Sequence, residues 1–247
     1  MNSSLVFYLQ NYWWCIILLA VFSYILGSIN FAVVFTRIVK KQDIRTLGSG
    51  NAGFTNVLRC VGVFPAVMTF VFDFLKAVIS VLAARLLVTF VPVGGLFLSE
   101  SLKTEYMYYT MLIAGLFCVV GHSFPVFFNF KGGKGVVTTA AMMAVVDWRF
   151  FLMVLGTFLI VFVFSRIISL SSIIAGIMMG PSCFIVTYLF MYKPALESAD
   201  PYTLSFVWVS TILAASIGVF AIIKHKDNIK RILKGEEKKI TAKKKEA

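Results

Sequence analysis

The last long apolar stretch of the chain, residues 203–223, reads TLSFVWVSTILAASIGVFAII. It contains no charged residue, and about 20 apolar residues allow a helix to cross the hydrocarbon core of a bilayer. The residues that follow, 224–231, read KHKDNIKR and are strongly basic. An apolar run that gives way to positive charge is typical of a helix that ends at a membrane surface. This stretch therefore predicts a membrane-spanning fold.

The rest of the chain has the same character. Of its 247 residues, 60% are hydrophobic and 14% are charged, whereas soluble domains average about 25% charged residues. We therefore expect an all-α polytopic membrane protein with about seven transmembrane helices, arranged as one helical domain over 1–235 with a basic tail over 236–247. The other predicted spans are 12–36, 62–91, 106–121, 150–165, 170–192 and a short fourth one, 136–146, which neighbouring helices would support.

The positive charge indicates the orientation. If the N-terminus lies outside, most lysines and arginines fall on the inner side, at 37–59, 131–134, 166 and 224–245. Cytoplasmic loops of membrane proteins carry such an excess. An even number of crossings would place the first basic loop and the basic tail on opposite sides of the membrane, which the charge bias disfavours. We expect the N-terminus outside and the C-terminus in the cytosol, with the tail near anionic lipid headgroups.

The composition also argues against several partners. No stretch combines basic and aromatic residues as a nucleic-acid module would, so no nucleic-acid partner is expected. The cysteines stand singly in apolar surroundings without metal-ligand spacing, so neither a metal site nor a disulfide is expected. They are Cys15, Cys60, Cys118 and Cys183. The sequence leaves the oligomeric state open, a monomer included.

Three polar segments exceed what a connecting loop needs. The first, residues 48–59, reads GSGNAGFTNVLR. Asn51, Thr55 and Arg59 are spaced by four, which predicts one face of a helix, and Ser49 would lie at its N-terminal end, where N–H groups favour anions. The alternative is a capped interfacial helix whose arginine meets lipid phosphate.

The second polar segment, residues 121–135, reads GHSFPVFFNFKGGKG. Gly132, Gly133 and Gly135 surround Lys134, so the backbone is expected to approach something closely. Free N–H groups beside an ammonium group would form an anion-binding nest. The segment is not a Walker loop, because no Ser or Thr follows Lys134. The alternative is a flexible turn with lysines on the cytosolic side.

The third polar segment is the basic end of the last span. His225, Asn228 and Arg231 are spaced by three and would share one side of a continuing helix. Histidine titrates near neutral pH, and Asn and Arg bind phosphate. The alternative is a helix end whose basic side chains reach toward the membrane surface.

Four further residues are predicted from their surroundings. Asp73 and Lys76 lie three apart inside the second span, where ionisable groups are usually paired or functional. We expect an ion pair, either structural or at the edge of a site. His122 is expected to pack at a helix end. Ser169, at a helix start, is more often a cap than a ligand.

In this order, the three segments resemble the bacterial acyl-phosphate:glycerol-3-phosphate acyltransferases of the PlsY type. The resemblance runs from Gly27 to Glu237 and implies a bacterial inner-membrane enzyme with its active site facing the cytosol. Such an enzyme moves an acyl group from acyl phosphate to the sn-1 hydroxyl of glycerol 3-phosphate, giving lysophosphatidic acid and phosphate, without a cofactor. The residues implicated by the resemblance are Ser49, Asn51, Thr55, Arg59, Lys134 with its glycines, Ser169, His225 and Asn228, while Glu237 matches a residue of structural importance.

The chain departs from the family pattern at four positions, none of them a presumed ligand. These are Asn30 in place of proline, Phe54 in place of alanine, Ala77 in place of glycine and Lys224 in place of arginine.

The implied chemistry suits the residues. Acyl phosphate is already activated, so the enzyme needs no nucleophile of its own. It must hold two anions together and stabilise developing negative charge, as Arg59, Lys134, Ser49 and the glycine amides could. His225 could take the hydroxyl proton or bind phosphate.

Two other function classes compete. A transporter of a phosphorylated solute would use a similar basic site, although such sites usually lie at mid-membrane between internal repeats. No such repeat is visible. An acyl-thioester-dependent acyltransferase would be expected to carry the familiar His-x-x-x-x-Asp motif, but Phe127 and Lys230 stand five residues after the two histidines.

Overall fold

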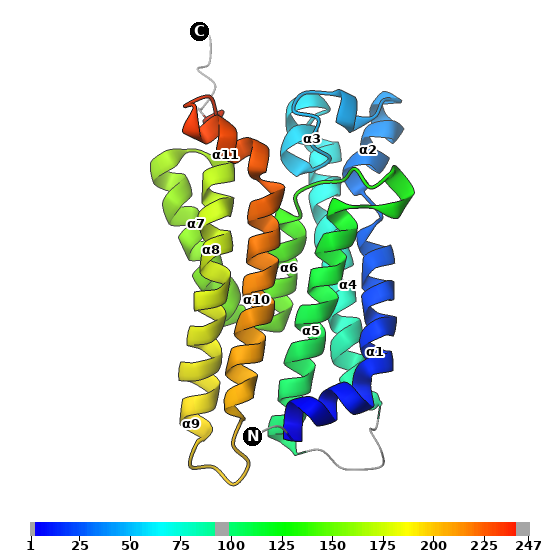
Figure 1. Ribbon diagram of the computed structural model, residues 1–247. Coiled ribbons are helices and arrows are strands. Elements are labelled where there is room, and N and C mark those ends of the chain that lie inside the picture. Colours follow the sequence, from blue (N-terminus) through cyan, green and yellow to red (C-terminus); the bar gives the residue numbers. More distant parts are fainter. Residues whose placement is uncertain (1–2, 92–98, 241–247) are drawn as a thin grey trace.

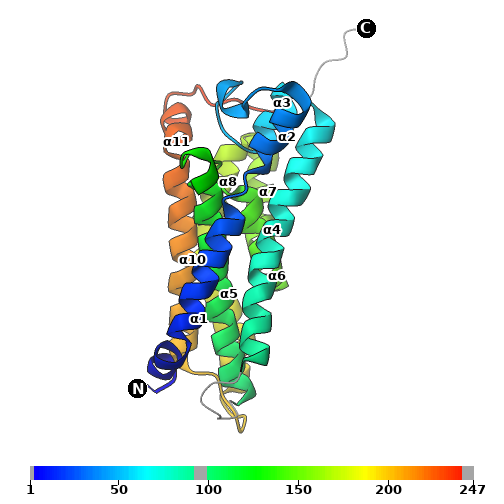
Figure 2. The same cartoon turned by 90° about the vertical axis from the view of Figure 1, so that its right-hand side faces the viewer.

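The computed structural model describes residues 3–91 and 99–240, and within these ranges every regular element is a helix (Figure 1). The main helices lie side by side as an elongated bundle (Figures 1 and 2). They are α1 (Ser3–Gly27), α4 (Val63–Phe90), α5 (Glu100–Ser123), α6 (Val136–Val146), α7 (Trp148–Ser165), α8 (Ile168–Thr187) and α10 (Leu204–Lys224). The shorter elements are α2 (Phe31–Lys40), η1 (Ile44–Thr46), α3 (Phe54–Cys60), η2 (Val126–Phe128), η3 (Tyr188–Tyr192), α9 (Lys193–Ala195) and α11 (Lys226–Leu233).

The predicted spans largely coincide with these helices. Six helical segments in the described ranges are long and apolar enough to cross a membrane, which confirms an all-α, multi-pass fold. α4 and α10 agree with the predicted spans to within one residue at each end. α5 begins at Glu100 rather than at 106, because the Ser99 side chain accepts the N–H of Leu102 and caps the helix within a polar stretch.

α6 coincides with the short fourth span. Its 11 residues make a helix about 16 Å long at 1.5 Å per residue, roughly half the thickness of the hydrocarbon core. α6 contacts α4, α5 and α7. Neighbouring helices therefore support the short helix, as the sequence led us to expect.

The first predicted span, 12–36, is wrong as a single helix. The chain forms α1 and α2 with a break at residues 28–30. Asn30 starts the second helix, since its side chain accepts the N–H of Val33 at 3.1 Å and donates to the carbonyl of Ala52 at 3.4 Å. The asparagine that departs from the family pattern is therefore a helix cap.

Glycines allow the long helices to pack closely. A Cβ on Gly27 of α1 would lie 2.2 Å from the carbonyl oxygen of Cys118, and one on Gly218 of α10 would lie 2.2 Å from that of Gly176. Small residues of this kind let membrane helices approach each other backbone to backbone. Any larger residue at these positions would separate α1 from α5 or α8 from α10.

One end of the bundle gathers the positive charge. α2, α3 and α11 lie together at this end, whereas α1 begins at the opposite end (Figures 1 and 2). We call it the basic end. Its lysines and arginines include Arg37, Lys40, Lys41, Arg45, Arg59, Lys131, Lys134, Arg166, Lys224 and Arg231. The three polar segments predicted from the sequence therefore lie at the same end of the protein.

Candidate active site at the basic end

The first polar segment folds around a residue that the sequence analysis did not single out. Asn56 accepts the backbone N–H of Ser49 at 3.0 Å and donates to the carbonyl of Leu47 at 2.9 Å. Gly48 and Gly50 have φ values of 56° and 71°, which glycine adopts readily. These contacts fix the loop that carries Ser49.

α3 is shorter than the sequence predicted. It begins at Phe54, and Gly53 before it is extended, with φ −161° and ψ 169°. Thr55 and Arg59 lie on this helix, but Asn51 lies in the preceding loop. The prediction that Asn51 shares their helix face is therefore wrong, and so is the placement of Ser49 at the helix N-terminus.

The glycines of the second segment do allow close approach, but to the protein itself. The N–H groups of Gly132 and Gly133 donate to the carbonyls of Ser123 and His122 at 3.3 and 3.1 Å. A Cβ on Gly132 would lie 2.0 Å from the His122 carbonyl oxygen. The prediction that these two amides form a free anion nest is wrong. Gly135, with φ 75°, starts α6.

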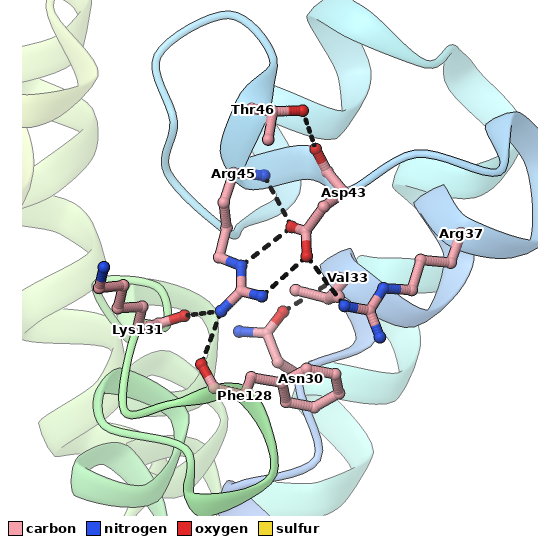
Figure 3. Close-up of polar contacts among 8 residues, drawn as sticks. All are labelled: Asn30, Val33, Arg37, Asp43, Arg45, Thr46, Phe128 and Lys131. Carbon is pink, nitrogen blue, oxygen red and sulfur yellow. Dashed lines mark hydrogen bonds and ion pairs between the residues drawn. The ribbon is translucent and has the colours of Figure 1, made fainter.

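Arg45, predicted only as one of the positive charges of the inner side, lies just before the first polar segment and bonds to the second. The Arg45 guanidinium group donates to both carboxylate oxygens of Asp43 and to the carbonyls of Phe128 and Lys131, at 2.6 and 3.2 Å (Figure 3). Arg37 donates to the same carboxylate at 3.0 Å. Hydrogen bonds from Arg45 lower the pKa of Asp43 to about 2. Asp43 and Arg45 thus hold the stretch just before the first polar segment against residues 131–135, which we call the glycine-lysine loop.

Lys134 joins the second segment to the third. Its Nζ donates to Oδ1 of Asn228, which is 5% exposed. Burial lowers the pKa of Lys134 to about 8. The ammonium group is therefore charged at neutral pH but poorly hydrated, which strengthens its attraction for an anion.

Glu237 accepts hydrogen bonds from several of the predicted site residues. Its Oε1 accepts the Asn228 amide at 2.6 Å and the Ser169 hydroxyl at 2.7 Å, and its Oε2 accepts Arg231 Nε at 2.6 Å. Burial opposes ionisation, but these hydrogen bonds outweigh it and lower the pKa of Glu237. The contacts also give Ser169 a role as a donor to this carboxylate, in place of the expected helix cap.

His225 lies at a break between two helices. α10 ends at Lys224 and α11 begins at Lys226, so the predicted continuous helix is wrong. His225 Nδ1 lies 2.7 Å from the carbonyl oxygen of Ala221. A carbonyl only accepts hydrogen bonds, so Nδ1 carries the proton. Burial lowers the pKa of His225 to about 4, which leaves Nε2 unprotonated at neutral pH.

An apolar cavity adjoins this histidine. It has a volume of about 200 Å³ and lies between α4, α6, α7, α8 and the end of α10. Val136 and His225 line it near the basic end, and Met143, Phe151 and Met179 line it elsewhere. Val136, the first residue after the glycine-lysine loop, lines the cavity. His225 therefore lies between an apolar cavity and the loop that carries Lys134.

The structure joins some of the predicted site residues and leaves others apart. Lys134, Asn228, Ser169 and Arg231 form one network through Glu237. Within residues 3–91 and 99–240, no hydrogen bond or ion pair joins Ser49, Thr55 or Arg59 to this network. The described residues also contain no group of three or more His, Cys, Asp or Glu side chains that could hold a metal ion. The arrangement suits an anion beside an apolar chain.

The chain is similar to known enzymes over most of its length. The family model for glycerol-3-phosphate acyltransferase matches residues 17–235. The glycerol-3-phosphate acyltransferase of Francisella philomiragia is 34% identical over 220 residues, which cover 89% of this chain and 90% of that protein. That of Prochlorococcus marinus is 34% identical over 226 residues, which cover 92% and 98%.

Solved structures agree with the sequence relatives. The crystal structure of PlsY (YgiH), an integral membrane glycerol 3-phosphate acyltransferase, in its glycerol 3-phosphate form is 32% identical with a TM-score of 0.68. The match covers 92% of this chain and 96% of that one. The lysophosphatidic acid form is 31% identical with the same TM-score. This chain therefore belongs to the glycerol-3-phosphate acyltransferase family of the PlsY type.

Proposed function

We propose that the protein transfers an acyl group from acyl phosphate to the sn-1 hydroxyl of glycerol 3-phosphate, at the cytosolic face of a bacterial inner membrane. The observation that carries this proposal is the position of His225, which lines the apolar cavity. The hydrogen-bonded Lys134 and Asn228 lie at the basic end of the bundle, as His225 does. A long-chain acyl phosphate has an apolar tail and an anionic head. Such a donor would fill the cavity and present its phosphate to the cations.

The reaction needs positioning and charge stabilisation. The hydroxyl oxygen attacks the acyl carbonyl carbon, the new ester bond forms, and the bond from that carbon to the phosphate oxygen breaks. Phosphate leaves and takes up the hydroxyl proton. Lys134 and Arg231 stabilise the negative charge, with Asn228 holding the ammonium group in place. For the acceptor phosphate we propose Ser49, Asn51, Thr55 and Arg59, together with the polypeptide backbone near Gly135.

His225 is proposed to bind the acceptor hydroxyl. Its unprotonated Nε2 can accept the hydroxyl hydrogen bond, whereas it cannot donate to a phosphate oxygen. A group with a pKa of about 4 is a weak general base at neutral pH. A phosphate oxygen, with a second pKa of about 6, is the better proton acceptor.

The donor is tested by supplying one donor at a time. Purified protein in lipid nanodiscs receives labelled glycerol 3-phosphate with acyl phosphate, acyl-CoA or acyl carrier protein. We expect lysophosphatidic acid from acyl phosphate alone, and none from a Lys134→Met control prepared in the same way. Product from a thioester would identify the acyl-thioester reaction, and solute uptake into proteoliposomes without product would identify a transporter.

The activity is expected to fall at alkaline pH. Lys134 has a pKa lowered to about 8, so kcat/KM of the free enzyme should decrease as the pH rises through about 8 and the ammonium group loses its proton. Arginine stays charged over this range. Initial rates from pH 6.5 to 9.5 should therefore show the decrease in the native protein and not in Lys134→Arg. The same decrease in both would contradict the assignment.

The apolar cavity is expected to set the acyl-chain length. Ala175 is 8% exposed and lines the cavity, so Ala175→Phe should fill part of it. Each excluded methylene forfeits about 0.8 kcal/mol of burial, or roughly fourfold in affinity. The ratio of kcat/KM for a long-chain to that for a short-chain acyl phosphate should fall at least tenfold. Val163→Phe, at an exposed position on α7, is the matched control, and an equal effect there would contradict the prediction.

The orientation and the domain division follow from the same proposal. With the basic end in the cytosol, the C-terminus is cytosolic and the N-terminus lies outside. Residues 1–235 would form the catalytic domain, followed by the tail. Glu237, at the start of the tail, bonds to Ser169, Asn228 and Arg231, while 241–247 lie outside the described residues. Labelling single cysteines in whole cells with a membrane-impermeant reagent tests the orientation.

A further inference from the structure

Three ionisable side chains are buried together below the glycine-lysine loop, and the chemistry above uses none of them. We call Asp73 and Lys76 of α4 and His122 of α5 the buried charge cluster, and each is at most 4% exposed. Lys76 Nζ lies 2.7 Å from Asp73 Oδ1 and 3.0 Å from His122 Nδ1. His122 Nδ1 lies 3.5 Å from the same carboxylate oxygen. Ionisable groups within a membrane protein are energetically costly and commonly mark function.

Lys76 joins α4 to the end of α1 and to the break before α2. Besides its contacts within the cluster, its Nζ donates to the carbonyls of Gly27 and Ile29 at 3.0 and 2.8 Å. Gly27 ends α1, and Ile29 lies in the break before α2. The three protons of the ammonium group are therefore shared among these two carbonyls, the Asp73 carboxylate and the His122 ring nitrogen.

His122 in turn supports the loop that carries Lys134. Its carbonyl oxygen accepts the N–H of Gly133 at 3.1 Å. A Cβ on Gly133 would lie 2.2 Å from His122 Nε2 and 2.5 Å from the carbonyl oxygen of Ala52. The backbone at Gly133 therefore rests directly on the imidazole, and only glycine fits there. Lys134 is the next residue.

We propose that the buried charge cluster positions Lys134 for acyl transfer. In this view Asp73, Lys76 and His122 are positioning residues that touch neither substrate. Asp73 and Lys76 hold the imidazole of His122 at the end of α5. The imidazole fixes the backbone at Gly133, and this backbone sets where the Lys134 side chain starts on its way to Asn228. Misplacing a catalytic group by about 1 Å can cost about 10²-fold in rate. This proposal rests on the proposed function.

The test replaces His122 by asparagine, which keeps a polar atom near Lys76 and removes the ring edge below Gly133. We expect kcat to fall 10- to 100-fold while KM for glycerol 3-phosphate changes less than threefold. Thr110→Val removes another buried polar group from α5 and should leave both constants unchanged. Unchanged kcat in His122→Asn would overturn the proposal.

Two further measurements separate positioning from a general structural role. In a Lys134→Arg background, His122→Asn should lower kcat less than threefold, because the effects of two substitutions do not add when one residue acts through the other. An equal loss in both backgrounds would overturn the proposal. Independently, hydrogen exchange at residues 131–135 should be at least tenfold faster in His122→Asn, with α10 unchanged. Unchanged exchange in the loop would also overturn the proposal that the cluster positions Lys134. Because this measurement needs no substrate, its outcome does not depend on the result of the donor assay.

Discussion

Lys134→Met is expected to lower kcat/KM for acyl transfer about 10³-fold. Methionine matches the length of much of the lysine side chain but removes the charge that contacts Asn228. Loss of one preorganised group that stabilises transition-state charge commonly costs about 10²–10³-fold, and the partly buried site leaves little water to replace it. The measurement is the initial rate of lysophosphatidic acid formation in nanodiscs at neutral pH.

Lys131→Met provides the matched control for this variant. Lys131 lies three residues away in the same loop, and its hydrogen bonds in the structure involve the backbone, the carbonyl accepting from Arg45 and the N–H donating to the Phe128 carbonyl. It should keep at least a third of the native activity. If both lysine variants lose activity equally, the loop acts through its overall charge and not through Lys134.

His225→Phe is expected to lower kcat about 10²-fold. Phenylalanine can occupy the edge of the apolar cavity but offers no nitrogen to accept a hydrogen bond from the acceptor hydroxyl. A site built to bind a hydroxyl loses far more from a missing partner than from a small change of volume. The thermal stability of the variant should stay close to that of the native protein, and this is measured in the same nanodiscs.

His225→Gln distinguishes binding from proton transfer. The glutamine amide oxygen can accept the hydroxyl hydrogen bond but cannot act as a general base. We expect turnover within about tenfold of native, because the pKa of about 4 makes the imidazole a weak base. A loss above about 10²-fold with substrate affinity intact would assign His225 as the general base instead.

Hydropathy predicted the helices because burial in lipid depends on composition over about 20 residues. Two of the differences between predicted spans and helices arise from single polar residues. Asn30 caps α2 and so breaks the first span, and Ser99 starts α5 within a polar stretch. Both effects depend on one side chain bonding one backbone N–H, which an average over an apolar window cannot detect.

The sequence predicted which kinds of residue form the site, but it did not predict which groups they would hydrogen-bond. Lysine beside glycines indicated an anion site, yet the hydrogen bonds of Gly132 and Gly133 go to the end of α5. The roles of Arg45 and Asn56 depend on carbonyl groups that only the fold brings near. Glu237 lies 68 residues from Ser169, a contact that no local spacing could predict.

The spacing of Asp73 and Lys76 bears on how the protein is made. α4 emerges from the ribosome before α5, so His122 is not yet present when α4 reaches the bilayer. One charged side chain at the centre of an inserting helix costs about 2.5–3.5 kcal/mol. Because the carboxylate and the ammonium group are 2.7 Å apart on one helix, α4 carries its own counterion. The pair can therefore enter the lipid without net charge of its own, and the histidine joins it when the following helix is inserted.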